Sequence, residues 1–145
     1  MSVLIVCVGN RHLRDDALGA RVLERLRCRE LPASIELWDG GLAGLDLLPV
    51  IERASHVVFV DAVIGAGPSE IAELTGETSQ LVVPHRFGHD AGLSYLLGAL
   101  PYVCDAPPSW ELVGADGAAD DALVEAVAAR ALESALSRVR AEVAA

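Results

Sequence analysis

Residues 3–19, VLIVCVGNRHLRDDALG, decide the fold of this chain. The stretch opens with six apolar residues, several of them β-branched, which is typical of a buried strand. The run stops at Gly9-Asn10, and apolar residues then recur at helical spacing as far as Leu26. We therefore predict a strand that leads through a short loop into a helix beginning at Asp15. Such loops line the ligand crevice in open α/β sheets, so this loop is a candidate functional site.

The loop lacks the glycine patterns that bind phosphate. Residues 9–12, GNRH, contain neither GxGxxG nor GxxxxGK[ST], so we predict no nucleotide cofactor. Two carboxylates, Asp15 and Asp16, follow where the helix is predicted to begin. They would repel a phosphate and attract a cation. A simpler role stays open, because acids in a first helical turn interact favourably with the helix dipole without any ligand.

Composition limits the class of protein and its partners. The 145 residues suit one compact domain over residues 1–145, and 52% hydrophobic residues is enough for a sizeable core. The net charge of −10 argues against nucleic-acid binding, which depends on basic groups that neutralise phosphates. The first residues lack the basic segment and cleavage site of an export signal, and their apolar run is too short to span a bilayer. We expect neither nucleic acid nor a membrane as a partner.

The cysteine pattern indicates a reducing environment. Cys7, Cys28 and Cys104 are odd in number, far apart and without a CxxC pair, so neither a disulfide framework nor a zinc knuckle is predicted. The cytoplasm is the expected location. Cys7 lies within the first predicted strand and is expected to act as a small hydrophobic residue, not as a nucleophile.

The rest of the chain alternates strand and helix patterns. We predict strands over residues 35–38, 56–60, 69–75, 81–83 and 110–114, helices over residues 15–29, 44–53, 91–100 and 120–143, and a connector over residues 101–108. This alternation predicts a single-domain α/β fold of three layers. Its sheet should be mainly parallel and doubly wound, with right-handed crossovers and helices on both faces.

Acidic residues recur at the predicted strand ends. Asp39 precedes two glycines that would permit positive φ or the close approach of another backbone, and Asp61 follows the third strand. Each alone is commonplace, since Asp often caps a turn or a helix. His89 precedes the helix predicted over residues 91–100, where a neutral imidazole can serve as a ligand or base.

Four segments, taken in order, resemble the hydrogenase maturation endopeptidases. They are GN…DDALG at 9–19, DGGLAG at 39–44, VDA at 60–62 and HDAGLSYLL at 89–97, and the resemblance extends to about Gly114. Members of that family remove a C-terminal peptide from the large subunit of nickel-containing hydrogenases after nickel is inserted, on a compact α/β fold. The resemblance implies an endopeptidase whose partner is a hydrogenase large-subunit precursor.

The resemblance also implies a set of site residues. Members of the family contact a metal through three residues: an acid in the loop between the first strand and the first helix, called the elbow below, an Asp after the third strand, and a His before the leucine-rich helix. In this sequence these positions are Asp16, Asp61 and His89. Two carboxylates and one imidazole leave open positions on nickel or zinc, where a metal can polarise a carbonyl or activate water. In the family the nickel arrives with the precursor and acts as a recognition element. Whether hydrolysis is aspartic-type or metal-assisted stays open. We expect the three side chains to converge at the carboxyl edge of the sheet, with Asp39 nearby.

The chain departs from the family pattern in two places. The family usually has Glu at the second acidic position of the elbow, and Asp16 is one methylene shorter. After Gly114, residues 115–119, ADGAA, stand where family members commonly have a loop containing Pro and Glu. The shorter acid favours an alternative function, in which an impaired member acts as a binding or chaperone module for a metalloenzyme subunit. A third class, a Rossmann-like domain that binds small molecules, would need the missing glycine fingerprint.

The remaining histidines are weaker candidates for the site. His85 lies four residues before His89, but the GLxxLL pattern that follows favours His89. We expect His12 and His56 to be surface or packing residues. The sequence does not determine which hydrogenase is processed, the cleavage site or the oligomeric state.

Overall fold

Five strands form one sheet in this protein, whose structure is a computed structural model that describes residues 2–12, 17–42, 44–63, 66–76 and 91–145. In chain order the strands are β1 (Ser2–Val8), β2 (Ile35–Gly41), β3 (Ala54–Ala62), β4 (Ala72–Thr75) and β5 (Ser109–Ala115). They lie in the order β2-β1-β3-β5-β4. β1, β2, β3 and β5 run parallel, whereas β4 pairs antiparallel with β5. The predicted mainly parallel sheet is confirmed.

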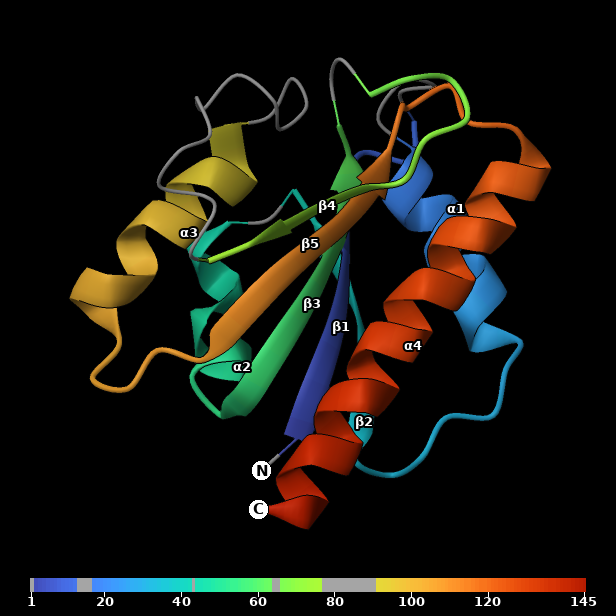
Figure 1. The fold of residues 1–145 in the computed structure, drawn as a ribbon. Helices are drawn as coiled ribbons and strands as arrows, with labels where there is room; N and C mark the ends of the chain where they lie inside the picture. The colour runs from blue at the N-terminus through green and yellow to red at the C-terminus, as the bar shows by residue number, and fades with distance from the viewer. Residues whose placement is uncertain (1, 13–16, 43, 64–65, 77–90) are drawn as a thin grey trace.

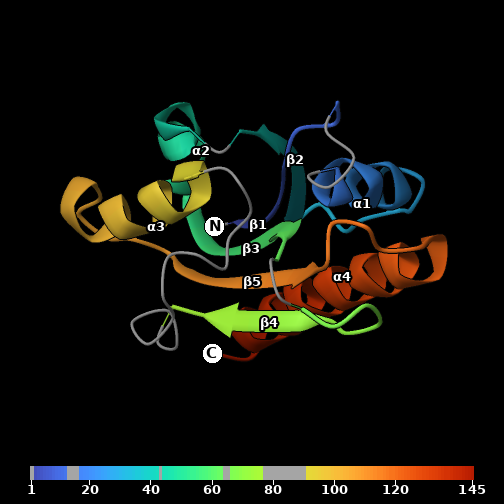
Figure 2. The ribbon, with the colours of Figure 1, turned by 90° about the horizontal axis from the view of Figure 1, so that it is seen from above.

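Helices cover both faces of the sheet (Figures 1 and 2). The helical segments are α1 (Leu18–Arg27), a 3-10 turn η2 (Leu45–Leu47), α2 (Leu48–Ile51), α3 (Ala91–Val103) and α4 (Asp121–Ala144). α1 and α4 pack on one face, and α2 and α3 pack on the other. The predicted three-layer α/β architecture is therefore confirmed. In the described part of the chain, no helix combines the length and the apolar character needed to cross a membrane.

The alternation of side chains along β1 supplies both cores. Val3, Ile5 and Cys7 join the core beneath α1 and α4, whereas Leu4 and Val6 join the core beneath α2 and α3. Cys7 is only 2% exposed, which confirms its predicted role as a small hydrophobic residue. Burial raises the pKa of its thiol to about 12, so the reactive thiolate is not available near neutral pH.

The helix after β1 begins later than predicted. α1 starts at Leu18 instead of Asp15, and its first turn contains no acidic residue. The apolar stripe that packs on the sheet starts at Leu18, and Gly19 lies directly on the backbone of Val8. The two acids thus precede the first turn of this helix instead of lying in it, so the boundary predicted at Asp15 is wrong. Asp15 and Asp16 themselves lie outside the described residues.

β2 continues past its predicted end at Trp38. The Gly9 N–H donates a hydrogen bond of 2.8 Å to the Gly41 carbonyl, which keeps the end of β2 attached to the chain that follows β1. A Cβ on Gly40 would lie 2.7 Å from a side chain of β1, and Gly41 has a φ of +51°. Gly40 thus permits the close approach of β1, and Gly41 adopts positive φ, as predicted. Gly41 is the last residue of β2 and does not form a separate turn.

Prolines account for two other wrong boundaries. The single helix predicted over residues 44–53 is a 3-10 turn followed by one α-helical turn, and Pro49 stands at the start of that turn, where no donor is needed. α3 continues through Pro101 to Val103, although a connector was predicted from residue 101. The Cys104 N–H donates to the Leu100 carbonyl at 3.1 Å, and both residues are buried, so packing holds this last turn.

The remaining elements follow their predictions with small shifts. β3 and β5 are longer than predicted at both ends, and β4 is shorter because it pairs only with residues 111–114 of β5. α4 matches its prediction, and its N-cap Asp120 accepts a hydrogen bond of 2.8 Å from the Leu123 N–H. The strand predicted over residues 81–83 lies outside the described residues.

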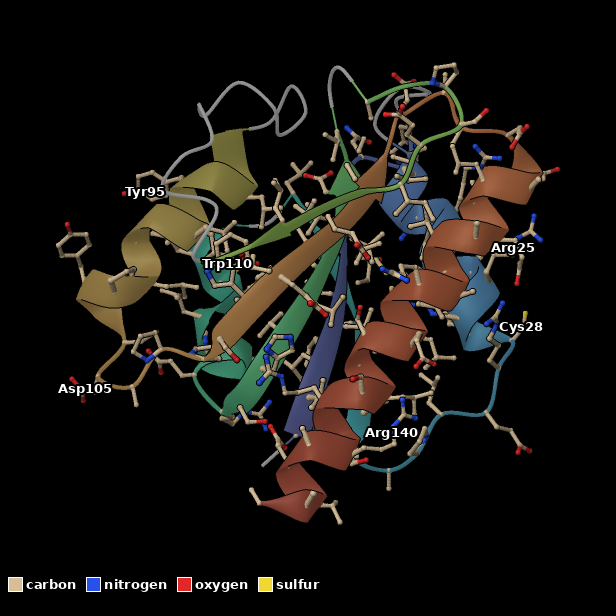
Figure 3. All side chains as sticks on the ribbon, viewed as in Figure 1. Arg25, Cys28, Tyr95, Asp105, Trp110 and Arg140 are labelled. Carbon is tan, nitrogen blue, oxygen red and sulfur yellow. The ribbon has the colours of Figure 1, made fainter. Side chains whose placement is uncertain are left out.

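Arg21 and Arg25 of α1, together with Arg29 just after its end, attach this helix to α4. Arg21 donates to the Ala119 carbonyl and to Asp121, immediately before and within the first turn of α4. Arg25 and Arg29 both pair with Glu125, and Figure 3 shows Arg25 beside α4. This set of contacts, which we call the arginine ladder, joins α1 to α4.

Candidate active site

Asp61 is a buried carboxylate at the carboxyl edge of the sheet. It is the penultimate residue of β3 and is 4% exposed. Its Oδ1 accepts a hydrogen bond of 2.8 Å from the N–H of Ala62. β3 lies between β1 and β5, which run parallel to it, so three strands end at this edge around Asp61. The strands of the core therefore hold this carboxylate in one position. A group that takes part in a reaction needs such a fixed position.

Asp39 lies at the same edge, on the far side of β1. The register pairs Cys7 with both Asp39 of β2 and Val60 of β3. Asp39 Oδ1 accepts from the Gly41 N–H at 3.0 Å, and its Oδ2 pairs with Arg11 Nη2 at 2.7 Å. The Arg11 and Asp39 side chains are 60% and 38% exposed, so this ion pair contributes at most about 1 kcal/mol to stability. Asp39 thus lies at the same sheet edge as Asp61, and its carboxylate is engaged with Arg11 and with the end of β2.

A hollow of about 300 Å³ opens where β1 and β2 end. Its polar lining comes from Asn10, Arg11, His12 and Asp39, and Leu42 supplies an apolar wall. β1 separates this hollow from Asp61. His12 is exposed, which confirms its predicted surface position. A hollow of this volume with polar and apolar walls can hold one residue of an extended polypeptide.

The other two predicted site residues, Asp16 and His89, lie outside the described residues, as does the competing His85. The helices that follow them are described: α1 and α3 both begin at the carboxyl edge of the sheet (Figure 1). The structure thus brings Asp61 and the starts of these two helices to one edge, and the convergence of the three side chains stays a prediction. Within the described ranges, no group of three or more His, Cys, Asp or Glu side chains is arranged to hold a metal ion.

A second cluster of ionisable groups lies in the amino halves of β3 and β5. His56 is 2% exposed, which confirms the prediction of a packing histidine. Its Nδ1 lies 2.7 Å from Ser109 Oγ, and its Nε2 lies 3.6 Å from Glu111 Oε1. This cluster has no signature in the sequence, because it depends on β3 and β5 being neighbours in the sheet. His56 and Ser109 are 53 residues apart and become directly paired only through the strand order.

Glu111 should make stability depend on pH. The neighbouring His56 ring is the main cause that lowers the pKa of Glu111, with Ser134 and Arg138 acting in the same direction and burial opposing them. A lowered folded-state pKa stabilises the fold above the unfolded value, and this stabilisation is lost as pH falls through the folded value. We expect Glu111→Gln to lower the melting temperature near pH 7, and the difference from wild type to shrink below about pH 4.5. Thermal unfolding from pH 3 to 7 measures this.

The exposed Glu24 provides the matched control for that measurement. Glu24→Gln removes one negative charge from the surface of α1 and should give a small difference at every pH. A Glu111→Gln difference that stays constant across the range would contradict the proposed role of the Glu111 carboxylate.

Comparison with known proteins relates most of the chain to one family. Residues 20–139 match the family model described as hydrogenase maturation protease, HycI. The matched range includes Asp61 and His89 and begins after Asp16. Most of the predicted site is therefore inside the region that the family shares.

Individual relatives agree with the family match. The chain is 33% identical over 118 residues to the hydrogenase 2 maturation protease of Escherichia coli strain K12, covering 79% of this chain and 72% of that protein. It is 42% identical over 120 residues to the hydrogenase expression/formation protein HupD of Rhodobacter capsulatus, covering 77% of this chain and 55% of that protein. The solved structure of the hydrogenase maturating endopeptidase HybD from Escherichia coli superimposes with a TM-score of 0.71 at 31% identity, covering 98% of this chain and 94% of that one.

Proposed function

This chain belongs to the hydrogenase maturation protease family and is a peptidase, and from that premise we propose that it removes a C-terminal peptide from the large-subunit precursor of a nickel-containing hydrogenase. The observation that carries the proposal is Asp61, a buried carboxylate at the carboxyl edge of a parallel sheet. The names of the relatives support the type of substrate.

We assign the reaction to Asp16, Asp61 and His89, which would contact the nickel that the precursor carries. The proposal is supported by sequence order, since Asp16 directly precedes Ala17 and His89 lies two residues before Ala91, and the helices that follow, α1 and α3, both begin at the Asp61 edge. Two carboxylates and one imidazole suit nickel, which would supply a Lewis acid for the scissile carbonyl. Asp61 would orient the attacking water and accept its proton, which makes the reaction either aspartic-type or metal-assisted.

The nickel centre of the precursor serves in this proposal as the mark of a finished large subunit. The protein would act on a precursor whose metal completes the set of ligands, and would leave an empty precursor uncut. We place the reaction in the cytoplasm. Support for that compartment comes from Cys7, Cys28 and Cys104, all of which are free thiols.

The nickel requirement can be tested with two forms of one precursor. The purified protein is incubated with nickel-loaded and nickel-free large subunit from its own organism, and the mass of the large subunit is measured over time. We expect loss of a C-terminal peptide from the loaded form alone, because only that form presents the metal to Asp61.

Two results would contradict this proposal in different ways. Equal processing of both forms would remove nickel recognition but keep the peptidase. Processing of neither form, together with stable binding of the loaded precursor in gel filtration, would favour the binding or chaperone function that the shorter Asp16 suggests.

A further inference from the structure

His56, Ser109 and Glu111 form a chain of polar contacts far from Asp61. His56 precedes Asp61 by five residues of β3, which corresponds to roughly 16 Å at about 3.3 Å per residue. The two side chains also point to opposite faces of the sheet, since Val58 and Val60 lie in the core beneath α1 and α4, and Val57 and Phe59 lie in the other core. This cluster is therefore separate from the proposed peptidase site.

The contacts give each member of the cluster a defined role. Glu111 lies on the Nε2 side of the His56 ring, so its carboxylate favours the tautomer that carries the proton on Nε2. Nδ1 is then left with a lone pair, and it lies 2.7 Å from Ser109 Oγ. The Ser109 hydroxyl can therefore donate to Nδ1, and the buried imidazole is placed to accept its proton. The order of groups is that of a serine nucleophile, a histidine base and an orienting acid.

Ser109 is accessible from a hollow of about 420 Å³. The residues of this hollow that matter here are His56, Pro108, Ser109, Trp110, Glu111 and Arg138. Pro108 and Trp110 give it an apolar wall, and Trp110 lies on β5 close to the end of β4 (Figure 3). The Trp110 ring also packs edge-on against Phe59 in the core beneath α2 and α3, with ring centroids 6.4 Å apart, which holds the indole in place. The guanidinium of Arg138 supplies a positive charge to the same hollow.

We propose that Ser109, with His56 as base and Glu111 as orienting acid, forms a second hydrolytic site that takes small esters with a short apolar acyl group. Ser109 Oγ bonds to the ester carbonyl carbon while its proton moves to His56 Nδ1. Arg138 stabilises the oxyanion that forms. The bond from the carbonyl carbon to the alcohol oxygen then breaks, and the alcohol leaves with the proton from Nδ1. Water repeats the sequence on the acyl-serine, which releases the carboxylic acid and restores Ser109.

Covalent labelling tests the nucleophile directly. The full chain is incubated with a fluorophosphonate, which forms an Oγ–phosphorus bond as fluoride leaves, and the modified residue is located by peptide mass spectrometry. We expect one time-dependent adduct, on Ser109, and none in Ser109→Ala. Ser69→Ala is the matched control, because Ser69 is also an exposed serine but does not line this hollow. No adduct on Ser109, or labelling that persists unchanged in Ser109→Ala, would overturn the proposal.

Ester hydrolysis tests the relay behind the nucleophile. We expect hydrolysis of 4-nitrophenyl acetate to have a kcat/KM that falls by about 100-fold or more in Ser109→Ala, since a positioned base and nucleophile contribute at least that factor. Glu111→Gln should lower kcat with little change in KM, because Glu111 acts through His56 and does not contact the ester. Circular dichroism confirms that each variant is folded. Rates equal to wild type in both variants would show that the cluster is only a packing arrangement.

Discussion

Asp61→Asn is expected to fold like wild type and to process nickel-loaded precursor at least about 1,000-fold more slowly, within the range that a positioned acid-base group contributes. The amide keeps the shape of the side chain and an oxygen that can accept from the Ala62 N–H, so the substitution removes mainly the negative charge. That charge is what a metal contact or an acid-base group at this position needs. The measurement is the mass of the large subunit after timed incubation, with thermal unfolding recorded in parallel.

The alanine variant separates the charge from the packing. Asp61→Ala also leaves the Ala62 N–H without its acceptor, so it should cost about 1–3 kcal/mol of stability in addition to the lost activity. Wild-type processing by Asp61→Asn would remove Asp61 from the mechanism, whatever the stability of either variant.

The role of Asp16 can be tested with two variants, Asp16→Ala and Asp16→Glu. Asp16→Ala should fold and fail to process, whereas a residue that acts only on the helix dipole would cost about 0.3–1 kcal/mol and leave processing intact. Asp16→Glu adds the methylene that is usual in the family. If the shorter acid impairs the site, the Glu variant gains activity; if the backbone has adjusted to Asp, the Glu variant gains none.

Gly19→Ala is expected to lower the free energy of unfolding by about 3 kcal/mol or more, at the upper end of what overpacking costs. A Cβ at this position would lie 2.0 Å from the carbonyl oxygen of Val8, 2.7 Å from its carbonyl carbon and 2.8 Å from its nitrogen. All three are backbone atoms of a strand that is buried from both faces, so no side-chain rotation relieves the contact. For a chain of this size the melting temperature should fall by roughly 6–12 °C.

Gly98 is the matched control for this substitution. It lies on the exposed side of α3, and a Cβ there would have no neighbour within 4 Å. Gly98→Ala should therefore raise stability by about 0.5–1 kcal/mol, because alanine loses less conformational entropy than glycine in a helix. Equal melting temperatures for the two alanine variants would contradict the close packing of α1 on β1.

Local sequence patterns predicted the elements that carry a long and regular apolar pattern. The apolar run of β1 and the long stripe of α4 carry enough periodicity to fix their type and approximate length. Boundaries were wrong where another part of the chain decides them. β2 continues to Gly41 because the Gly9 N–H meets it, and α3 continues past Pro101 because Leu100 and Cys104 are buried. The antiparallel direction of β4 likewise depends on its pairing with β5 and has no signature in its four residues.

The two candidate sites also differ in how far the sequence predicts them. Asp61 was predictable, because an aspartate directly after a strongly apolar strand must lie at the edge where parallel strands end. The partners of His56 were not predictable, because Ser109 and Glu111 meet it only through the order of β3 and β5 in the sheet. A resemblance between sequences transfers the first kind of site and gives no warning of the second.

The arginine ladder between α1 and α4 couples the local unfolding of these two helices. Arg21, Arg25 and Arg29 connect the first helix to residues that lie 96 or more positions later, and every acid they reach belongs to the first turns of α4. Local unfolding proceeds in cooperative units, and α1 and α4 share both these contacts and one hydrophobic core, so we expect them to unfold as one unit. Backbone amides of α1 and α4 should consequently become protected from hydrogen exchange together.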